Sequence, residues 1–249
     1  MHSWVAIALT PLLTVAAAVT NPAVTCASPQ LLSINASQVP PYHFPDGSGF
    51  EDRLIVEMFA RLGVEVRIRD VPSARGLVLL EQGEDDGTLA RNEAAARGKL
   101  NFVMIPEKVL DRDYAVFAKG KDIHVASWEG LARYRVGVMS GWRIVAERLP
   151  KAARVTSVSD HRQLFRLVEN DRVDAVVFNS WGGLYAAREL GLENVRPLPT
   201  FLGTEPSFFF LHRRHEALAA VAADALRDMK RDGTYDRIYD QILRPLEQR

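Results

Sequence analysis

The chain has 249 residues, enough for one large domain or two small ones. Hydrophobic residues make up 47% of it and charged residues 25%, which is the composition of an ordinary globular protein. The 31 Lys and Arg residues equal the 31 Asp and Glu residues in number, so no net charge draws the protein to nucleic acid or to an anionic membrane.

The N-terminus has a different character from the rest of the chain. No charged residue occurs over positions 4–24, a run long enough to span a membrane. Pro11 and Pro22 interrupt this run and small residues close it, which is typical of a signal peptide. We therefore expect residues 1–27 to be removed on export to the periplasm, although the first residues lack the usual basic side chain. The alternative is an uncleaved membrane anchor.

The only cysteine is Cys26, just before the expected cleavage point. Cleavage after Ala27 leaves no thiol, which excludes cysteine nucleophiles and thiolate metal sites. Lipid attachment to Cys26 is the alternative, but the preceding residues fit a lipoprotein signal poorly. No histidine pair has the spacing of a helical zinc site, and no glycine-rich phosphate loop occurs, so we expect neither a metal nor a cofactor.

Short apolar strands alternate with amphipathic helices along the mature chain. The first half predicts strands at 31–34, 64–68, near 88, 102–105 and 114–118, and helices over 50–62 and 73–82. Ser73 is a candidate N-cap of the second helix. The second half predicts strands at 136–139, 154–158, 174–178 and 208–211, and helices up to 149, from 160, over 181–190, and twice after 215 with a break at 232–234. Two sets of strand–helix units imply an α/β fold with two cores.

Five short segments together resemble the family 3 extracytoplasmic solute-binding proteins, the polar amino-acid-binding proteins of ABC importers. They are Pro40-Pro41-Tyr42 with Gly49-Phe50, the helix–Gly–Asp step of 77–86, the strand and turn of 136–141, the VDAVV step of 173–177 and the helix break at Asp232-Gly233-Thr234. The resemblance covers nearly the whole mature chain.

The resemblance implies a two-lobed fold of the periplasmic-binding-protein type II, in which two hinge crossovers join the lobes. Lobe 1 would comprise residues 28–118 with 205–249, and lobe 2 residues 119–204. A small polar ligand, anionic or amino-acid-like, would bind in the cleft, and the lobes would close around it. We expect a monomer that stays out of the membrane after signal cleavage and presents the ligand to an ABC permease or a membrane sensor.

Arginine side chains are the candidates for binding an anion. Arg91 would emerge at the C-terminal end of a strand, where open α/β sheets bind ligands, and its guanidinium suits a carboxylate or phosphate. Family members place the corresponding Arg closer to Arg97, so the choice between the two stays open. Arg75, at the first turn of a helix, is a further candidate. A solvated surface position is the alternative for Arg75 and Arg91.

Aromatic and small residues complete the candidate site. Tyr42 and Trp142 could contact a ligand with their ring faces, or else cover the cores of their own lobes. Ser140 and Gly141 would open a helix whose free N–H groups can bind an anion.

Asn179 departs from the family pattern. Amino-acid binders of the family usually carry an Asp at this position, which pairs with the ammonium group of the ligand. An amide carries no charge, so ordinary α-amino acid recognition is weakened. Glu205, near the second crossover, is a candidate replacement carboxylate, with a surface charge as the alternative.

Three functions remain after these observations. The first is reversible binding of a small molecule by a protein that is not an enzyme. The second is an exported enzyme on the same fold, similar to cyclohexadienyl dehydratases, for which Glu205 or His43 could be the general acid. The third is a stand-alone ligand sensor.

Overall fold

The computed structural model describes residues 30–37, 39–120 and 123–247, so the expected signal peptide and Cys26 lie outside the described residues. The strands in this part of the chain are β1 (Gln30–Ala36), β2 (Val64–Asp70), β3 (Gly87–Asn92), β4 (Phe102–Met104), β5 (Leu110–Lys119), β6 (Arg135–Met139), β7 (Arg154–Val158), β8 (Ala175–Asn179) and β9 (Val195–His212). The α-helices are α1 (Phe50–Ala60), α2 (Ser73–Gln82), α3 (Arg143–Arg148), α4 (His161–Glu169), α5 (Ser180–Glu189), α6 (Glu216–Arg231) and α7 (Thr234–Ile242). None of the helices described is long and apolar enough to cross a membrane.

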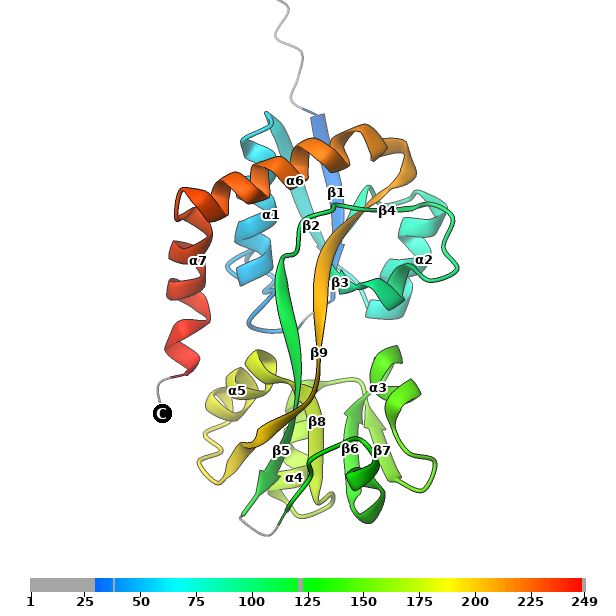
Figure 1. Cartoon of the computed structure of the whole chain (residues 1–249), viewed down its shortest axis with the longest axis vertical. Helices are drawn as coiled ribbons and strands as arrows, with labels where there is room; N and C mark the ends of the chain where they lie inside the picture. Colours follow the sequence, from blue (N-terminus) through cyan, green and yellow to red (C-terminus); the bar gives the residue numbers. More distant parts are fainter. Residues whose placement is uncertain (1–29, 38, 121–122, 248–249) are drawn as a thin grey trace, which may run out of the picture.

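The strands form one sheet that extends through both halves of the molecule (Figure 1). Their order is β2-β1-β3-β9-β5-β8-β6-β7, and β4 also pairs with β9. In the upper half of Figure 1, β1 is parallel to β2 and β3; in the lower half, β6 is parallel to β7 and β8. The antiparallel pair β5 and β9 passes from one half to the other, which confirms the α/β fold with two lobes and two crossovers.

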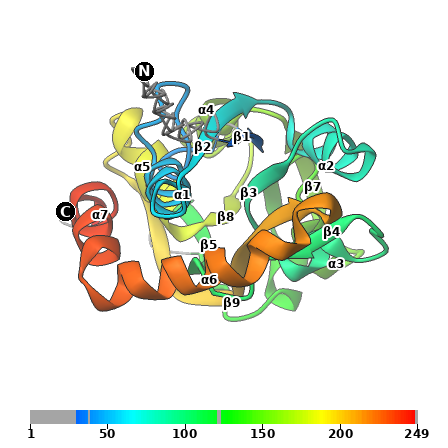
Figure 2. The ribbon, with the colours of Figure 1, turned by 90° about the horizontal axis from the view of Figure 1, so that it is seen from above.

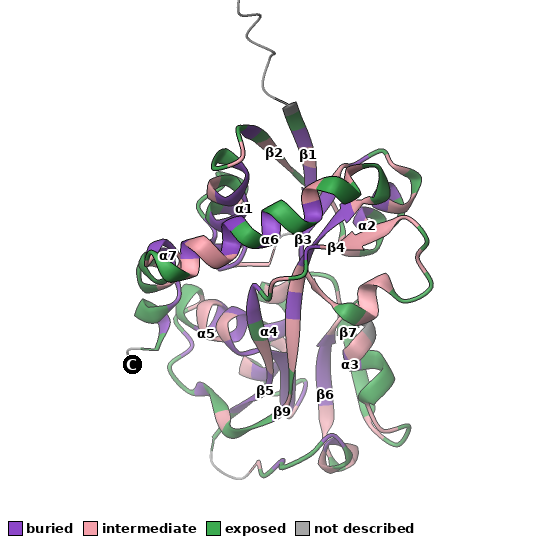
Figure 3. Cartoon of the chain, turned by 45° about the horizontal axis from the view of Figure 1, so that its top comes forward, coloured by how far each residue is buried: buried purple, intermediate pink, exposed green. Residues whose placement is uncertain are grey.

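Each half has its own hydrophobic core. In the upper half, α1 packs against α6 and α7 beside the sheet (Figures 1 and 2), and its buried side chains join those of β1. Buried and exposed residues alternate along α6, as expected of a helix with one face on a core (Figure 3). Two smaller clusters fill the lower half. Both long strands contribute side chains to the cores of both halves, so these cores mark no single boundary residue. The predicted lobe bounds therefore stay a prediction: residues 28–118 with 205–249 for lobe 1, and residues 119–204 for lobe 2.

The sequence predicts a strand only at 208–211, whereas β9 extends over Val195–His212. Two prolines, Pro197 and Pro199, and Gly203 in its first half conceal the strand, since proline cannot donate to a ladder. The structure accommodates them because β9 pairs with β5 through shifts in register, where the two strands cross between the halves.

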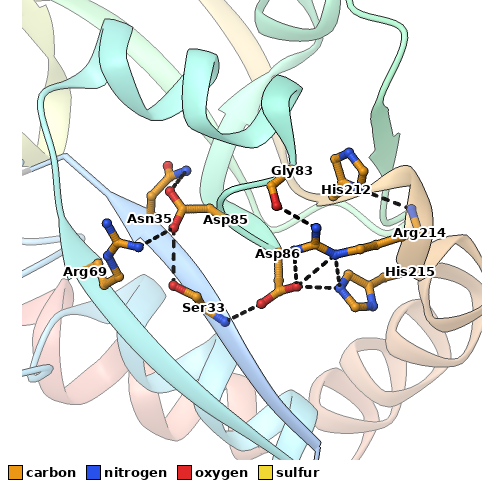
Figure 4. Close-up of polar contacts among 9 residues, drawn as sticks. All are labelled: Ser33, Asn35, Arg69, Gly83, Asp85, Asp86, His212, Arg214 and His215. Carbon is orange, nitrogen blue, oxygen red and sulfur yellow. Dashed lines mark hydrogen bonds and ion pairs between the residues drawn. The ribbon is translucent and has the colours of Figure 1, made fainter.

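A polar network fixes the step from α2 to β3, at the segment that resembles the helix–Gly–Asp motif (Figure 4). Asp86 accepts hydrogen bonds from the backbone of Ser33 at 2.8 Å and from Arg214 at 2.6 Å, and it pairs with His215 at 2.6 Å. The neighbouring Asp85 is fully buried and has its own partners on β1 and β2. This motif therefore joins β1 and β3 to the start of α6, and its role is structural.

The N-terminal cap of α2 differs from the prediction. Ser73 is the first residue of α2 and provides no cap, because Pro72 takes the N-cap position. The Ser73 hydroxyl instead accepts a hydrogen bond from Arg91 at 2.8 Å.

Candidate functional site

A cavity of about 930 Å³ lies between the two halves of the molecule. Its walls come from the loop after β1, α2, β3 and β5 on one side, and from β6, α3, β7 and the end of β8 on the other. Of the predicted site residues, Tyr42, Arg91, Gly141, Trp142 and Asn179 line it. Although Tyr42 and Asn179 are 137 positions apart in the sequence, the fold brings these residues to one place.

Arg91 is positioned at the end of β3 by an irregular register against β9. One terminal nitrogen, Nη1, donates to Ser73 Oγ at 2.8 Å, while the buried Nη2 has no hydrogen-bond partner. Burial, together with the repulsion of Arg112, lowers the pKa of Arg91 to about 10, so the side chain is still a cation at neutral pH. A buried cation with a free donor requires an anionic partner.

Tyr42 and Asn179 are hydrogen-bonded to each other at the cavity wall. The Tyr42 hydroxyl donates to Asn179 Oδ1 at 2.9 Å, and the same oxygen accepts from the backbone N–H of Gly182 at 2.7 Å, which caps α5. These two bonds assign the oxygen and nitrogen of the amide, because a backbone N–H can only donate. The remaining atom, Asn179 Nδ2, is a buried donor with no partner.

Arg112 and Glu51 also line the cavity, and the sequence does not identify either of them. The Arg112 guanidinium donates to the Glu51 carboxylate and to the carbonyl of Ala90, and it lies 4.2 Å from the centre of the Tyr42 ring. Burial raises the pKa of Glu51, although Arg112 and Arg91 oppose this effect. Arg112 was missed because the sequence pattern starts the fifth strand at 114, two residues after it.

The loop that carries Tyr42 is anchored by His43. Its Nδ1 lies 2.6 Å from Asp52 on α1, and its Nε2 lies 2.5 Å from Asp70 at the end of β2. Asp52 also accepts from the backbone of Gly49, which ties the loop to the first turn of α1. These contacts hold Tyr42 in its buried position at the cavity wall.

The segment 140–142 differs from the helix start that the sequence predicts. Gly141 has a left-handed backbone, with φ of 79°, and α3 begins only at 143 and is short. The N–H of Ser140 bonds to the carbonyl of Val158, and its hydroxyl lies 2.8 Å from that of Ser157, so Ser140 is a turn residue outside the cavity wall. Trp142 does line the cavity, stacked on Phe178 with 4.7 Å between ring centres.

Besides Ser140, three predicted candidates are not among the cavity-lining residues. Arg75 is exposed on α2. Arg97 is exposed and lies 3.9 Å from Glu147 of the other half, so of the two arginines left open by the sequence, Arg91 is the one that lines the cavity. Glu205 on β9 pairs with Arg148 and therefore does not replace the carboxylate that Asn179 lacks. Local sequence could not distinguish these charged residues from Arg91, which does line the cavity.

The cavity wall is mainly apolar. Glu51 is the only carboxylate among the described residues that line it, and it is paired with Arg112. No group of His, Cys, Asp or Glu side chains in the described ranges is arranged to hold a metal ion. The arrangement is that of a two-lobed protein with a ligand cavity at its hinge.

Comparison with known proteins defines the class further. The model of the bacterial extracellular solute-binding proteins, family 3, matches residues 33–245, so the chain belongs to this family. An uncharacterised protein of Shewanella oneidensis is 26% identical over 216 residues, covering 80% of this chain and 76% of that protein.

Two solved structures show the same fold. One is an ancestral arginine-binding protein bound to arginine, with 25% identity, a TM-score of 0.73, and coverage of 87% of this chain and 99% of that one. The other is an ancestral amino-acid-binding protein described as a precursor of cyclohexadienyl dehydratase, with 22% identity, a TM-score of 0.71, and coverage of 86% and 95%.

Proposed function

We propose that this protein is a periplasmic solute-binding protein that closes on a carboxylate-bearing organic solute and presents it to a membrane partner, an ABC permease in the first place and a sensor as the alternative. The observation that carries the proposal is a pair of buried donors without partners, Arg91 Nη2 and Asn179 Nδ2, both in residues that line one cavity. Four buried side-chain atoms in the described part of the chain lack partners, and only these two belong to cavity-lining residues. Both donors need an acceptor, and an anionic oxygen is the acceptor that also suits the charge of Arg91.

Charge favours the same ligand class. Arg91 and Arg112 are both cations at the cavity, and Glu51 offsets only one of them. The excess positive charge is buried, where an unpaired charge is costly. A ligand carboxylate supplies the missing negative charge, and bidentate contact with a guanidinium adds specificity.

The same geometry disfavours an α-ammonium group. A ligand ammonium needs an acceptor, but Asn179 Oδ1 already accepts from Tyr42 and Gly182. Glu51 is already bonded to Arg112 and to the N–H of Ala90. We therefore infer a ligand whose recognised group is an acid without a neighbouring amine, in contrast to the amino acids bound by the family members above.

Dehydratase activity is the second candidate, because Glu51 is a cavity-lining carboxyl whose pKa is raised by burial. The other candidate acids are less suited to this reaction. Glu205 lies outside the cavity wall, and both ring nitrogens of His43 are occupied by carboxylates. Incubation with prephenate or arogenate, with product formation followed by absorbance, distinguishes this activity from reversible binding.

Calorimetric titration and thermal shift with a panel of carboxylates, amino acids, amines and sugars test the proposal. A carboxylate should stabilise the protein without being consumed. Arg91→Ala should weaken its binding about 10- to 100-fold, because a charged hydrogen bond contributes roughly 1.5–3 kcal/mol. Arg75→Ala, which removes an exposed arginine of the same lobe, is the matched control. Unchanged binding in Arg91→Ala would exclude the proposed anion site.

A further inference from the structure

The cavity wall includes many residues besides Arg91 and Asn179. Some of them come from α2 and the short 3-10 helix at Glu93–Ala96 in one half, and others from α3 and β7 in the other half; Figure 1 shows where α2, α3 and β7 lie. Several of these residues are apolar, namely Leu77, Val78, Ala95, Ile144, Leu149 and Val155. These six side chains are here called the apolar branch of the cavity.

Two valines in this branch are unusually open to solvent. Val78 is 47% exposed and Val155 is 44% exposed, and they belong to opposite halves of the molecule. Exposed apolar side chains that gather at one place mark a surface that is covered when a ligand or partner binds. Because both residues line the same cavity, a ligand bound in that cavity can cover them.

The charged residues near the branch provide no site for a ligand cation. Lys99 and Lys151 are the only charged described residues on its walls, and no carboxylate is there to hold a ligand cation. The cavity volume of about 930 Å³ lies near the upper end of the roughly 300–1,000 Å³ of sites for drug-sized ligands. The volume leaves room for a ligand with a body beyond its acid group.

From this juxtaposition we infer that the ligand is an amphipathic carboxylate, with its acid group at Arg91 and Asn179 and an extended apolar tail between Val78 and Val155. This inference rests on the proposed function, because it assumes that the carboxylate binds at the donor region. It adds the substrate class: an acid with a medium-length alkyl or aryl-alkyl body, in place of a polar amino acid.

Titration with butanoate, hexanoate and octanoate tests the tail. Each added CH₂ group that becomes buried should tighten binding by about three- to fourfold, so affinity should rise steadily along the series. Val155→Ser and Val78→Ser should reduce the gain from hexanoate to octanoate by a larger factor than they reduce butanoate binding. Val221→Ser is the control, since Val221 is 43% exposed on α6 and does not line the cavity.

The two proposals fail in different ways. If butanoate binds and the longer acids bind no more tightly, the apolar tail is refuted while the anion site stands. If octanoate binding increases but the two serine variants retain the full gain, the tail lies elsewhere and the inference is likewise overturned. If none of the acids binds the wild-type protein, or if Arg91→Ala binds them all as well as wild type does, the proposed function itself is wrong.

Discussion

Asn179 caps α5 and also lines the cavity, and the first role restricts the second. Its oxygen accepts from the N–H of Gly182 and from the hydroxyl of Tyr42, so the cavity is left with the N–H₂ group. An Asp at this position would have an oxygen in place of Nδ2 as well, so both of its terminal atoms would be acceptors. One atom thus changes the wall from an acceptor of ammonium groups to a donor for acids.

Asn179→Asp isolates this change. Aspartate keeps the cap of α5, because Asn and Asp are equally good at the N-cap, so stability should change little. It removes the donor and adds a negative charge beside the bound anion. We expect carboxylate binding to weaken more than about tenfold by titration calorimetry. Asn170→Asp, at an exposed position outside the cavity wall, is the control for net charge, and equal affinity in both variants would contradict the assignment.

Among the elements, α5 depends on glycine for its close packing against β5. It starts directly after β8, and its Gly183 lies against the ring of Phe117 on β5. A β-carbon at Gly183 would lie 2.0 Å from the ring of Phe117, and Phe117 is fully buried. Close approach of helix and strand is therefore possible only with glycine.

Gly183→Ala should destabilise the protein by about 1–3 kcal/mol, the typical effect of overpacking a well-packed core. The free energy of unfolding in urea measures this effect. Gly130→Ala is the matched control, because the nearest atom to its added β-carbon is 3.6 Å away. Equal stability of the two variants would show that α5 can shift away from β5 without cost.

At the scale of the whole molecule, buried charge links stability to pH. His43 joins the loop after β1 to α1 and β2 through Asp52 and Asp70. Burial by itself lowers the pKa of His43, but the two carboxylates outweigh burial, and the pKa is raised overall. Its protonated form is therefore the one that the native structure favours.

A raised native pKa fixes the sign of the pH effect. The stabilisation by His43 should be complete below the unfolded-state pKa of about 6.5, and it should be lost as the pH rises through the native pKa. Urea unfolding of wild type and His43→Gln between pH 5 and pH 9 measures it, and the difference in free energy should shrink toward high pH. His124→Gln, at an exposed position, is the control. A difference that does not vary with pH would mean that His43 contributes only as a neutral side chain.

The sequence by itself determined the order and type of most elements. Strands and helices such as β2, α2, β8 and α6 follow from local periodicity, which depends on neighbouring residues alone. The resemblance in five segments, now established as family membership, also belongs to the sequence, because each segment is a short contiguous pattern. The sequence singled out Tyr42 as an aromatic residue in a proline-rich loop, Arg91 at the end of a strand and Trp142 at a helix start, and all three line the cavity.

Only the tertiary structure decided how these residues combine. The sequence concealed the first half of β9, since its prolines are tolerated solely because it pairs irregularly with β5 at the crossover. It did not single out Arg112 or Glu51, and it offered no means to separate Arg91 from Arg97, because charged residues look alike until burial is known. The hydrogen bond between Tyr42 and Asn179 joins positions far apart in the chain. The character of the cavity depends on such long-range contacts, which no local pattern encodes.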